Sequence, residues 1–332
     1  MNKKMRFFSM FLILALAVSF LAACGAPAAS QPAASAATSG QAAAELEGTL
    51  SISGAFALYP MMQRWAEEFN KLHPKVVFDV QAGGAGKGMS DALAGQVEIG
   101  MVSRDIAAEE EAKGAYWVAV VKDAVFPTIS AQNPVLQDLL AQGLTQEQFE
   151  KLFITGEIKT WGELVGKPEI TDEVHVYTRS DSCGAAEVWA KYLGGKKQED
   201  LLGVGISSDP GLLDTVIKDP LGIGYNNLNY AYDVNGSPVT GAAVLPIDAN
   251  SDGKAEETEL LETKSEAQDS VASGRYPSPP ARALNLVTNG KPTGIVQEFI
   301  RWILTDGQQY VPEAGYVALT GEQINASLDK IK

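Results

Sequence analysis

The chain has 332 residues, a formal net charge of −15 at pH 7 and two cysteines. Its length allows one large or two medium-sized domains with a real core. An acidic surface repels nucleic acid and anionic lipid, which argues against both as partners recognised through charge.

The N-terminus has the pattern of an export signal. A basic start over residues 3–6 precedes an uncharged, largely apolar run over residues 7–20, and Leu21-Ala22-Ala23-Cys24 follows. A small-residue cleavage site with Cys at the new first position is typical of a lipoprotein signal peptide. The alternative, a permanent transmembrane helix, needs about 20 apolar residues, more than this run provides. We therefore predict a signal peptide over residues 1–23 and an extracytoplasmic protein anchored to the membrane by a lipid on Cys24.

A flexible linker is predicted over residues 24–45. Between Cys24 and Glu45 the chain is almost wholly Ala, Gly, Ser, Pro, Gln and Thr, with no charge and no large apolar side chain. Such a segment cannot bury enough surface to fold. Because Cys24 carries the lipid, Cys183 has no cysteine partner, and no disulfide within the chain is expected.

From residue 49 onward, short β-rich runs alternate with helical periodicity. Apolar residues after the first run recur at spacings of three and four, which predicts an amphipathic helix. These are Leu58, Met61, Met62, Trp65, Phe69 and Leu72. Strands are expected over residues 49–53, 76–81, 99–103 and 117–121, with a glycine loop at 83–88 and a short helix to about residue 94. This order implies a mostly parallel sheet covered by helices.

A second unit follows Pro127. Thr145 and Gln148 form a capping box that predicts the start of a helix at 146–153. Further elements are expected as strands over 174–178, 222–226 and 284–288 and as helices over 185–193 and 296–303. The Pro/Ser/Gly stretch 274–280 interrupts the pattern before the last strand and helix. We therefore predict an α/β fold of two lobes with two hinge crossings: residues 46–125 plus 283–332 form lobe 1, and residues 126–282 form lobe 2.

Three predicted junctions between a strand and a helix offer backbone N–H groups to an anion. They lie at residues 53–57, 83–88 and 179–185. Such junctions point several N–H donors and the positive end of a helix at one spot. The alternative at each is a tight turn in which glycine only relieves strain. The glycine loop is not a Walker A loop, because it lacks the Gly-Lys-Ser/Thr ending.

Six segments occur in the order found in one protein family. They are residues 51–60 (SISGAFALYP), 65–69 (WAEEF), 83–88 (GGAGKG), 99–104 (IGMVSR), 177–181 (YTRSD) and 222–225 (GIGY). From about residue 48 to 318, the chain resembles the phosphate-binding proteins of bacterial phosphate ABC importers. The resemblance implies a periplasmic-binding-protein fold of class II type, in which each lobe is a mainly parallel sheet flanked by helices. It also implies closure on a solute and delivery to a membrane permease.

The chain departs from this family where the family grips its anion with hydroxyl groups. Ala55 and Phe56 replace a Ser/Thr pair, Ala85 replaces a Ser, and Cys183 and Ala185 replace the Ser and Thr of Arg-x-Asp-x-Ser-Gly-Thr. At about 1–1.5 kcal/mol per hydrogen bond, the loss of about four hydrogen bonds among these five positions amounts to roughly 4–6 kcal/mol, or three to four decades in affinity. The substitutions therefore favour a ligand other than phosphate.

The groups that remain suit a small anion, including an organic one. Arg179 can hold a carboxylate or oxyanion bidentately, and aromatic side chains can contact an apolar body. The segment from Tyr225 to Tyr230 either lines the cleft or closes a loop over the lobe edge. The predicted ligand-binding residues are Ala55, Phe56, Ala57, Gly84, Ala85, Gly86, Ser103, Arg104, Arg179, Cys183, Gly184, Ala185 and Tyr225.

Cys183 suggests a more specific chemistry. A thiol at a helix N-terminus beside Arg179 should have a lowered pKa and bind a thiophilic species such as arsenite. The alternative is a small, polarizable filler in place of Ser. Catalysis by this thiol would need a base, yet His73 and His175 are the chain's histidines and neither is obviously paired with it. The sequence therefore predicts a protein that is not an enzyme and has no catalytic cofactor.

Residues 248–259 fit the calcium-loop pattern Asp-x-Asn-x-Asp-Gly-x5-Glu. The predicted ligands are Asp248, Asn250, Asp252, Lys254, Glu256 and Glu259. The preceding run 242–247 reads as a strand, so we expect one structural calcium loop rather than a switching EF-hand pair. The alternative is an acidic, solvated turn.

Together these features predict a monomeric solute-binding lipoprotein of an ABC importer. It would bind a small anion in the cleft between its lobes by hinge closure and present the closed form to an ABC permease. A sensor whose closure is read by a membrane receptor or kinase is an alternative, because it uses the same fold and motion.

Overall fold

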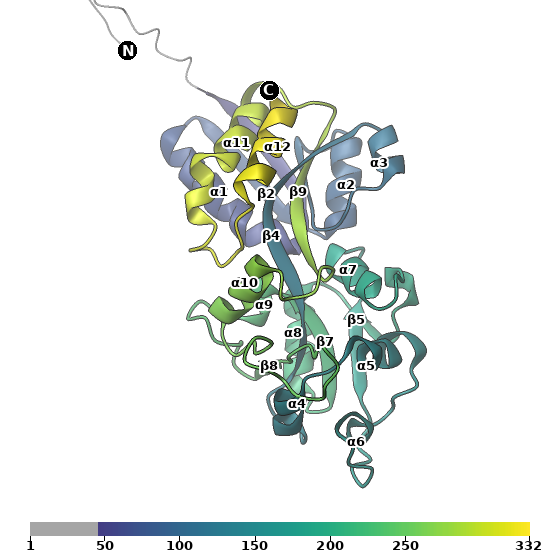
Figure 1. Cartoon of the computed structure of the whole chain (residues 1–332). Helices are drawn as coiled ribbons and strands as arrows, with labels where there is room; N and C mark the ends of the chain where they lie inside the picture. The colour runs from purple at the N-terminus through teal and green to yellow at the C-terminus, as the bar shows by residue number, and fades with distance from the viewer. Residues whose placement is uncertain (1–45) are drawn as a thin grey trace, which may run out of the picture. The chain divides into compact units, whose positions relative to one another are not determined.

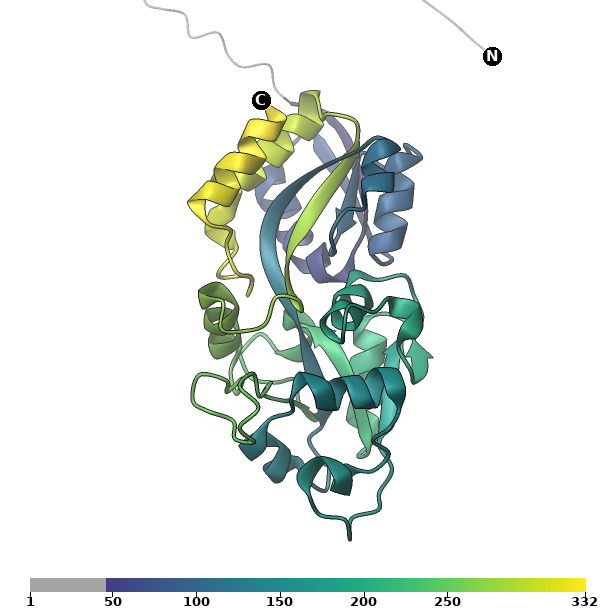
Figure 2. The same cartoon turned by 45° about the vertical axis from the view of Figure 1, so that its right-hand side comes forward.

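A computed structural model describes residues 46–332, so the predicted signal peptide, the lipid-carrying Cys24 and the linker lie outside the described residues. Two hydrophobic cores organise this part of the chain. The ribbon around them is shown in two views in Figures 1 and 2. One core gathers residues from 50–121 and 284–331, and we call this part lobe 1. The other gathers residues from 124–281 together with Val317, and we call it lobe 2. None of the helices within residues 46–332 has the length and hydropathy that crossing a bilayer requires.

One sheet runs through both lobes. The strands in the described part of the chain are β1 (Gly48–Gly54), β2 (Val76–Ala82), β3 (Ile99–Val102), β4 (Ala115–Ser130), β5 (His175–Arg179), β6 (Val204–Ile206), β7 (Gly222–Asn227), β8 (Ala242–Val244) and β9 (Ala281–Asn289). Their order is β2-β1-β3-β9-β4-β7-β5-β6, with β8 paired to β4. β1 is parallel to β2 and β3, and β5 is parallel to β6 and β7. β4 and β9 are antiparallel to their neighbours.

The lobes are connected by β4 and β9, which lie side by side (Figure 1). β4 has 16 residues; Val118 and Val121 belong to the core of lobe 1, whereas Val125 and Phe126 belong to that of lobe 2. The sequence predicted a strand ending at residue 121, but the strand continues through Pro127. Proline has no N–H to donate to the sheet, but its carbonyl oxygen still accepts a backbone hydrogen bond of 3.0 Å from Leu245.

The α-helices of the described residues cover both faces of the sheet. They are α1 (Tyr59–Leu72), α2 (Ala85–Leu93), α3 (Ala108–Ala112), α4 (Leu136–Gln142), α5 (Gln146–Glu150), α6 (Trp161–Val165), α7 (Gly184–Tyr192), α8 (Asp209–Lys218), α9 (Leu228–Ala231), α10 (Lys264–Ser273), α11 (Gly294–Leu304) and α12 (Gly321–Ile331).

Two helix predictions need correction and one is confirmed. The buried face of α1 ends at Phe69, because Leu72 in the last turn is 59% exposed. The predicted glycine loop is largely helical, since α2 begins at Ala85. The capping box of α5 is present, and the Gln148 backbone N–H donates to the Thr145 hydroxyl at 3.2 Å.

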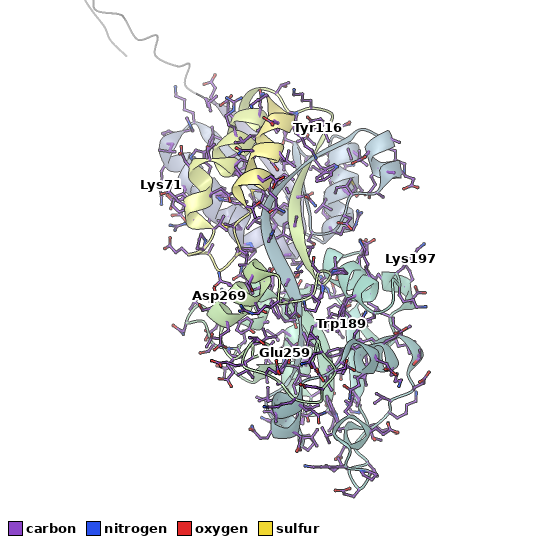
Figure 3. The ribbon with its side chains drawn as sticks, viewed as in Figure 1. Lys71, Tyr116, Trp189, Lys197, Glu259 and Asp269 are labelled. Atoms are coloured by element: carbon purple, nitrogen blue, oxygen red, sulfur yellow. The ribbon has the colours of Figure 1, made fainter. Side chains whose placement is uncertain are left out.

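Aromatic packing fixes α7, the helix that follows the third predicted junction. Trp189 of α7 lies in the interior of lobe 2, whereas Lys71 and Lys197 lie at the periphery (Figure 3). The ring of Trp189 stacks on Tyr225 with centroids 5.7 Å apart and meets Phe149 edge-on at 5.1 Å. Because such contacts hold the helix against the sheet, they fix the position of its N-terminus.

Candidate functional site

The three predicted junctions meet where lobe 1 faces lobe 2. The Gly86 backbone N–H of lobe 1 donates to the carbonyl oxygen of Ser182 in lobe 2 at 3.2 Å. A Cβ atom on Gly84 or Gly86 would overlap Ser182, and one on Gly184 would overlap Ser103. Glycine is required at Gly84 and Gly184 because the backbones of the two lobes approach so closely there, whereas at Gly86 the overlap is with the Ser182 side chain. We call this contact region the junction cluster.

The predicted main-chain donors fall into two groups. The N–H groups of Ala55, Gly84 and Gly86 are engaged by carbonyl oxygens of Met101, Gly54 and Ser182 at 2.9–3.2 Å. For five others the structure shows no acceptor among the described residues: the amides of Phe56, Ala57, Ala85, Gly184 and Ala185. These five belong to the first residues of helical segments in both lobes. Orphan N–H groups at helix starts are the usual donors to bound anions.

Arg179 is less free than the sequence predicted. Its Nε and Nη2 donate to the two carboxylate oxygens of Asp181 at 2.8 and 2.6 Å, and its Nη1 donates to Asp209 at 2.6 Å. The Phe56 ring lies over the guanidinium, with its centroid 5.4 Å away. Burial acts to lower the pKa of Arg179, but the carboxylates of Asp209 and Asp181 outweigh it and raise this pKa. The guanidinium therefore already has two carboxylate partners.

Asp209 is the main residue that sequence reasoning missed. It is fully buried at the start of α8, and its carboxylate also accepts hydrogen bonds from the backbone N–H and the side-chain amide of Asn227, at 3.1 and 2.9 Å. The sequence Ser208-Asp209-Pro210 signals a helix start. It does not signal that this aspartate faces Arg179, a contact between residues 30 positions apart.

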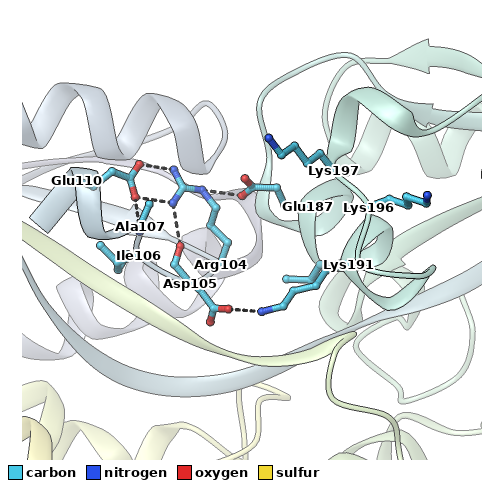
Figure 4. Close-up of a pocket in the computed structure, with 11 residues that line it drawn as sticks. Arg104, Asp105, Ile106, Ala107, Glu110, Glu187, Lys191, Lys196 and Lys197 are labelled. Atoms are coloured by element: carbon cyan, nitrogen blue, oxygen red, sulfur yellow. Dashed lines mark hydrogen bonds and ion pairs between the residues drawn. The ribbon is translucent and has the colours of Figure 1, made fainter.

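Arg104 contributes to a contact between the lobes. Its guanidinium donates to both oxygens of Glu110 at 2.7 and 2.8 Å within lobe 1 and lies 2.7 Å from Glu187 of lobe 2 (Figure 4). Asp105 and Lys191 form a second ion pair between the lobes at 2.6 Å. These groups line a cavity of about 490 Å³. Because most of them are partly exposed, the pairs contribute little stability.

The prediction of a lowered pKa at Cys183 is wrong. The residue is 5% exposed, and its Sγ accepts a hydrogen bond from the Ala186 backbone N–H at 3.4 Å. Burial raises the pKa of the thiol to about 12, against the lowering effect of Arg179. A neutral thiol that caps α7 fits the interpretation of Cys183 as a filler in place of Ser.

Tyr225 supports the strand that carries Arg179 and does not itself line the site. The residue is fully buried, its hydroxyl lies 2.8 Å from the Thr178 hydroxyl, and it accepts a hydrogen bond from the Arg179 backbone N–H at 3.3 Å. Tyr230, at the other end of the same segment, donates to the Phe56 carbonyl oxygen at 3.2 Å. This segment thus fixes the strand carrying Arg179 and reaches lobe 1 at its far end.

In the candidate calcium loop, carboxylate oxygens accept hydrogen bonds from backbone N–H groups of the same loop. Asp248 accepts from the Gly253 N–H at 2.9 Å, and Glu259 accepts from the Ala249 N–H at 2.9 Å. No three His, Cys, Asp or Glu side chains gather as a metal site anywhere in residues 46–332. Calcium binding by this loop stays a prediction.

A buried carboxylate and a buried guanidinium face each other where the chain passes between the lobes. Asp123 of β4 is in register with Arg282 of β9, and the Arg282 Nη1 lies 3.1 Å from the Asp123 carboxylate. Burial raises the pKa of Asp123 from 3.8 to about 6, although Arg282 acts to lower it.

This pKa gives an expected pH dependence of stability. Because the folded protein binds the proton more tightly than the unfolded chain, the contribution of Asp123 to the free energy of unfolding falls as pH rises from 3.8 to about 6. The loss is at most on the order of 3 kcal/mol. Denaturant titrations between pH 4 and 7 should show this slope in the wild type and a weaker one in Asp123→Asn; equal slopes would contradict the assignment.

Gly184→Ala should oppose closure without unfolding either lobe. The new Cβ meets the carbonyl and hydroxyl oxygens of Ser103 across the lobe contact. We expect a melting temperature close to that of the wild type and an anion affinity at least about tenfold weaker. Gly321→Ala is the control, because nothing lies within 4 Å of its Cβ position. Unchanged affinity in Gly184→Ala would show that the contact plays no part in binding.

Comparisons with known proteins agree with this arrangement. The family model of the PBP superfamily domain matches residues 31–307. The phosphate-binding protein PstS of Bacillus subtilis is 31% identical over 322 residues, covering 95% of each chain. A crystal structure from Clostridium perfringens, described as a phosphate ABC transporter substrate-binding protein with bound phosphate, has a TM-score of 0.67 and 24% identity, covering 82% of this chain and all of its own. An ABC-type phosphate transport receptor of Vibrio cholerae has a TM-score of 0.59 and 20% identity, covering 81% of this chain and all of its own. These structural likenesses confirm the predicted two-lobe α/β fold.

Proposed function

Because this chain belongs to the phosphate-binding-protein family of the PBP superfamily, we propose that it captures a small anion between its lobes and presents it to the permease of an ABC importer. The relatives are phosphate-binding proteins and not enzymes, in agreement with the predicted absence of catalysis. Substrate-binding proteins of ABC importers act outside the cytoplasm, which places the proposed site there.

The observation that carries this proposal is the set of orphan amides in the junction cluster. Phe56, Ala57 and Ala85 belong to lobe 1, whereas Gly184 and Ala185 belong to lobe 2. Each group sits at the start of a helical segment, where the helix dipole favours negative charge. An anion that accepts hydrogen bonds from both groups at once stabilises the closed arrangement more than the open one.

The proposed ligand is a small anion held mainly by these amides, and phosphate is expected to bind weakly. Two observations support this. The family's donor hydroxyls are replaced by Ala, Phe or Cys at the positions named above. In addition, the fully buried carboxylate of Asp209, which lies outside the family motif, is 2.6 Å from Arg179, so part of the charge of this single guanidinium is already neutralised.

A thermal-shift screen of the mature protein tests the proposal. The probes are phosphate, sulfate, arsenate, a phosphonate, small carboxylates and arsenite. A ligand that binds only the folded state raises the melting temperature by mass action, so even a weak ligand is detected at high concentration. We expect at least one oxyanion or carboxylate to raise the melting temperature. Arsenite should not raise it, because the Cys183 thiol is buried and neutral. No shift with any anion would contradict the proposed function.

The lipid anchor is a separate part of the proposal. A lipidated Cys24 would keep the folded part near the membrane, at the end of the linker formed by residues 24–45. Palmitate labelling of cells producing the wild type and Cys24→Ala tests it. Label and membrane association should both be lost in the variant; a variant that stays labelled would exclude Cys24 as the lipid site.

Calcium binding by residues 248–259 also remains a proposal. The spacing of the oxygen-bearing residues supports it, and Gly253 has the positive φ of 77° that the sharp turn of such a loop needs. Calcium should raise the melting temperature of the wild type and have no such effect on Asp252→Ala. If calcium shifts both proteins equally or neither, the segment is an acidic turn and not a calcium loop.

A further inference from the structure

Arg282 has partners in both lobes. Its Nε donates to the Ser103 carbonyl oxygen of lobe 1 at 3.2 Å, and its Nη2 donates to the side-chain oxygen of Asn227 in lobe 2. Its Nη1 lies 3.1 Å from the Asp123 carboxylate as an ion pair without the alignment of a hydrogen bond. The Arg282 side chain is 5% exposed, so these protein groups take the place of water around its charge.

The position of Arg282 makes these contacts depend on how the lobes are arranged. The residue lies at the start of β9, in register with Asp123 of β4, and both strands connect the lobes (Figure 1). A hinge rotation about these strands changes the separation between Ser103 and Asn227. A single guanidinium cannot stay hydrogen-bonded to both Ser103 and Asn227 when they move apart. An open arrangement therefore leaves a buried donor or acceptor without its partner, which costs free energy.

Asn227 extends the same network toward the junction cluster. Its side-chain oxygen accepts from Arg282, while its side-chain nitrogen donates to Asp209 at 2.9 Å. Asp209 in turn accepts from Arg179 at 2.6 Å. An unbroken series of hydrogen bonds thus links the strand crossing to the arginine beside the orphan amides. Buried networks of this kind have few alternative arrangements, because each group needs a partner.

We propose that Arg282 is a positioning residue that couples closure of the lobes to the orientation of Arg179. In the closed arrangement its guanidinium joins Ser103 to Asn227, and Asn227 and Asp209 hold Arg179 against the junction cluster. Opening breaks the contact of Arg282 with Ser103 or with Asn227, so Asn227 and Asp209 no longer fix the Nη1 side of Arg179, whereas Asp181 still holds its other side. The complete anion site and the closed form therefore appear together. This inference rests on the proposed function, since it describes how capture is linked to closure.

If Arg282 had a purely structural role, the expected effects of substitutions at this position would differ. If the residue only neutralised Asp123, any cation at position 282 would be sufficient. Arg282→Lys keeps the charge beside Asp123, but an ammonium group lacks the planar fork that reaches Ser103 and Asn227 together. The expected result is a protein that still folds, with a lower melting temperature because a buried acceptor loses its donor, and with coupling lost. Arg275→Gln is the matched control, because this arginine is exposed and lies in the same part of the chain.

Small-angle X-ray scattering and calorimetric titration with inorganic phosphate provide the readouts. We expect the ligand-free Arg282→Lys protein to have a larger radius of gyration than the wild type, to contract less with phosphate, and to bind it at least about tenfold more weakly. A double variant, Asp123→Asn with Arg282→Gln, removes both charges and should behave in the same way. Equal radii and affinities in the wild type and Arg282→Lys would overturn the inference.

The same data separate this inference from the proposed function. If the wild type neither contracts with phosphate nor binds it or any anion of the thermal-shift panel, the proposed function fails. The ligand-free radii still decide the role of Arg282: a more expanded Arg282→Lys protein supports it as the residue that holds the lobes together, and identical radii overturn it.

Discussion

Asp209→Ala lowers the free energy of unfolding by about 3–5 kcal/mol, the expected cost of breaking a buried ion pair. The carboxylate is fully buried and accepts hydrogen bonds from Arg179 and from two N–H groups of Asn227. Its removal leaves part of the Arg179 guanidinium and the Asn227 amide without acceptors in the interior. Urea denaturation followed by circular dichroism measures the change.

The control for Asp209 is on the same helix. Asp214 of α8 pairs with Lys218 at 2.6 Å, but its side chain is 59% exposed. Asp214→Ala should change the free energy of unfolding by no more than about 0.5 kcal/mol. Similar losses in the two variants would show that any ion-paired aspartate of α8 contributes as much, and that burial beside Arg179 does not set the cost.

Restoring hydroxyl groups to the junction cluster should create high-affinity phosphate binding. The triple variant Ala85→Ser, Cys183→Ser and Ala185→Thr returns three of the donors that the resemblance implies for the family. At about 1–1.5 kcal/mol each, they should raise phosphate affinity by two to three decades. Isothermal titration calorimetry of the wild type and the variant with phosphate measures the difference.

The hydroxyls can be separated from simple changes of shape. Ala185→Val matches the size of Thr without its oxygen, and Cys183→Ala removes the sulfur without adding a donor. A variant with these two changes should bind phosphate no better than the wild type. If it gains affinity as the hydroxyl variant does, or if the hydroxyl variant gains none, the absent hydroxyls do not account for the ligand preference.

Local patterns were enough to predict the order of elements but not the full course of the connection between lobes. Short β-rich runs led to β1, β2 and β3 almost to the residue. β4 was predicted only over 117–121, whereas the strand runs from Ala115 to Ser130 and continues through the polar pair Lys122 and Asp123. Asp123 is tolerated inside the strand only because Arg282, 159 positions later, faces it in register. No local signal reports such a partner.

For the ionisable groups of the site, too, local sequence patterns did not show which partners and how much burial each group has. The sequence marked Arg179 as a candidate by its place before a helix, but its partner Asp209 comes from another helix. Likewise, the helix N-terminus led to the expectation of a lowered pKa at Cys183, whereas burial dominates and raises it. The predicted glycine positions were informative because close approach of two backbones demands glycine whatever the partner is.

Amide chemical shifts provide the most direct test of capture between the lobes by main-chain donors. The protein, labelled with ¹⁵N, is titrated with the anion that raises its melting temperature most. The expected result is that the amide signals of Phe56, Ala57 and Ala85 in lobe 1 and of Gly184 and Ala185 in lobe 2 shift together, with one common affinity. Shifts confined to one lobe, or centred on the Arg104 cavity instead, would contradict it.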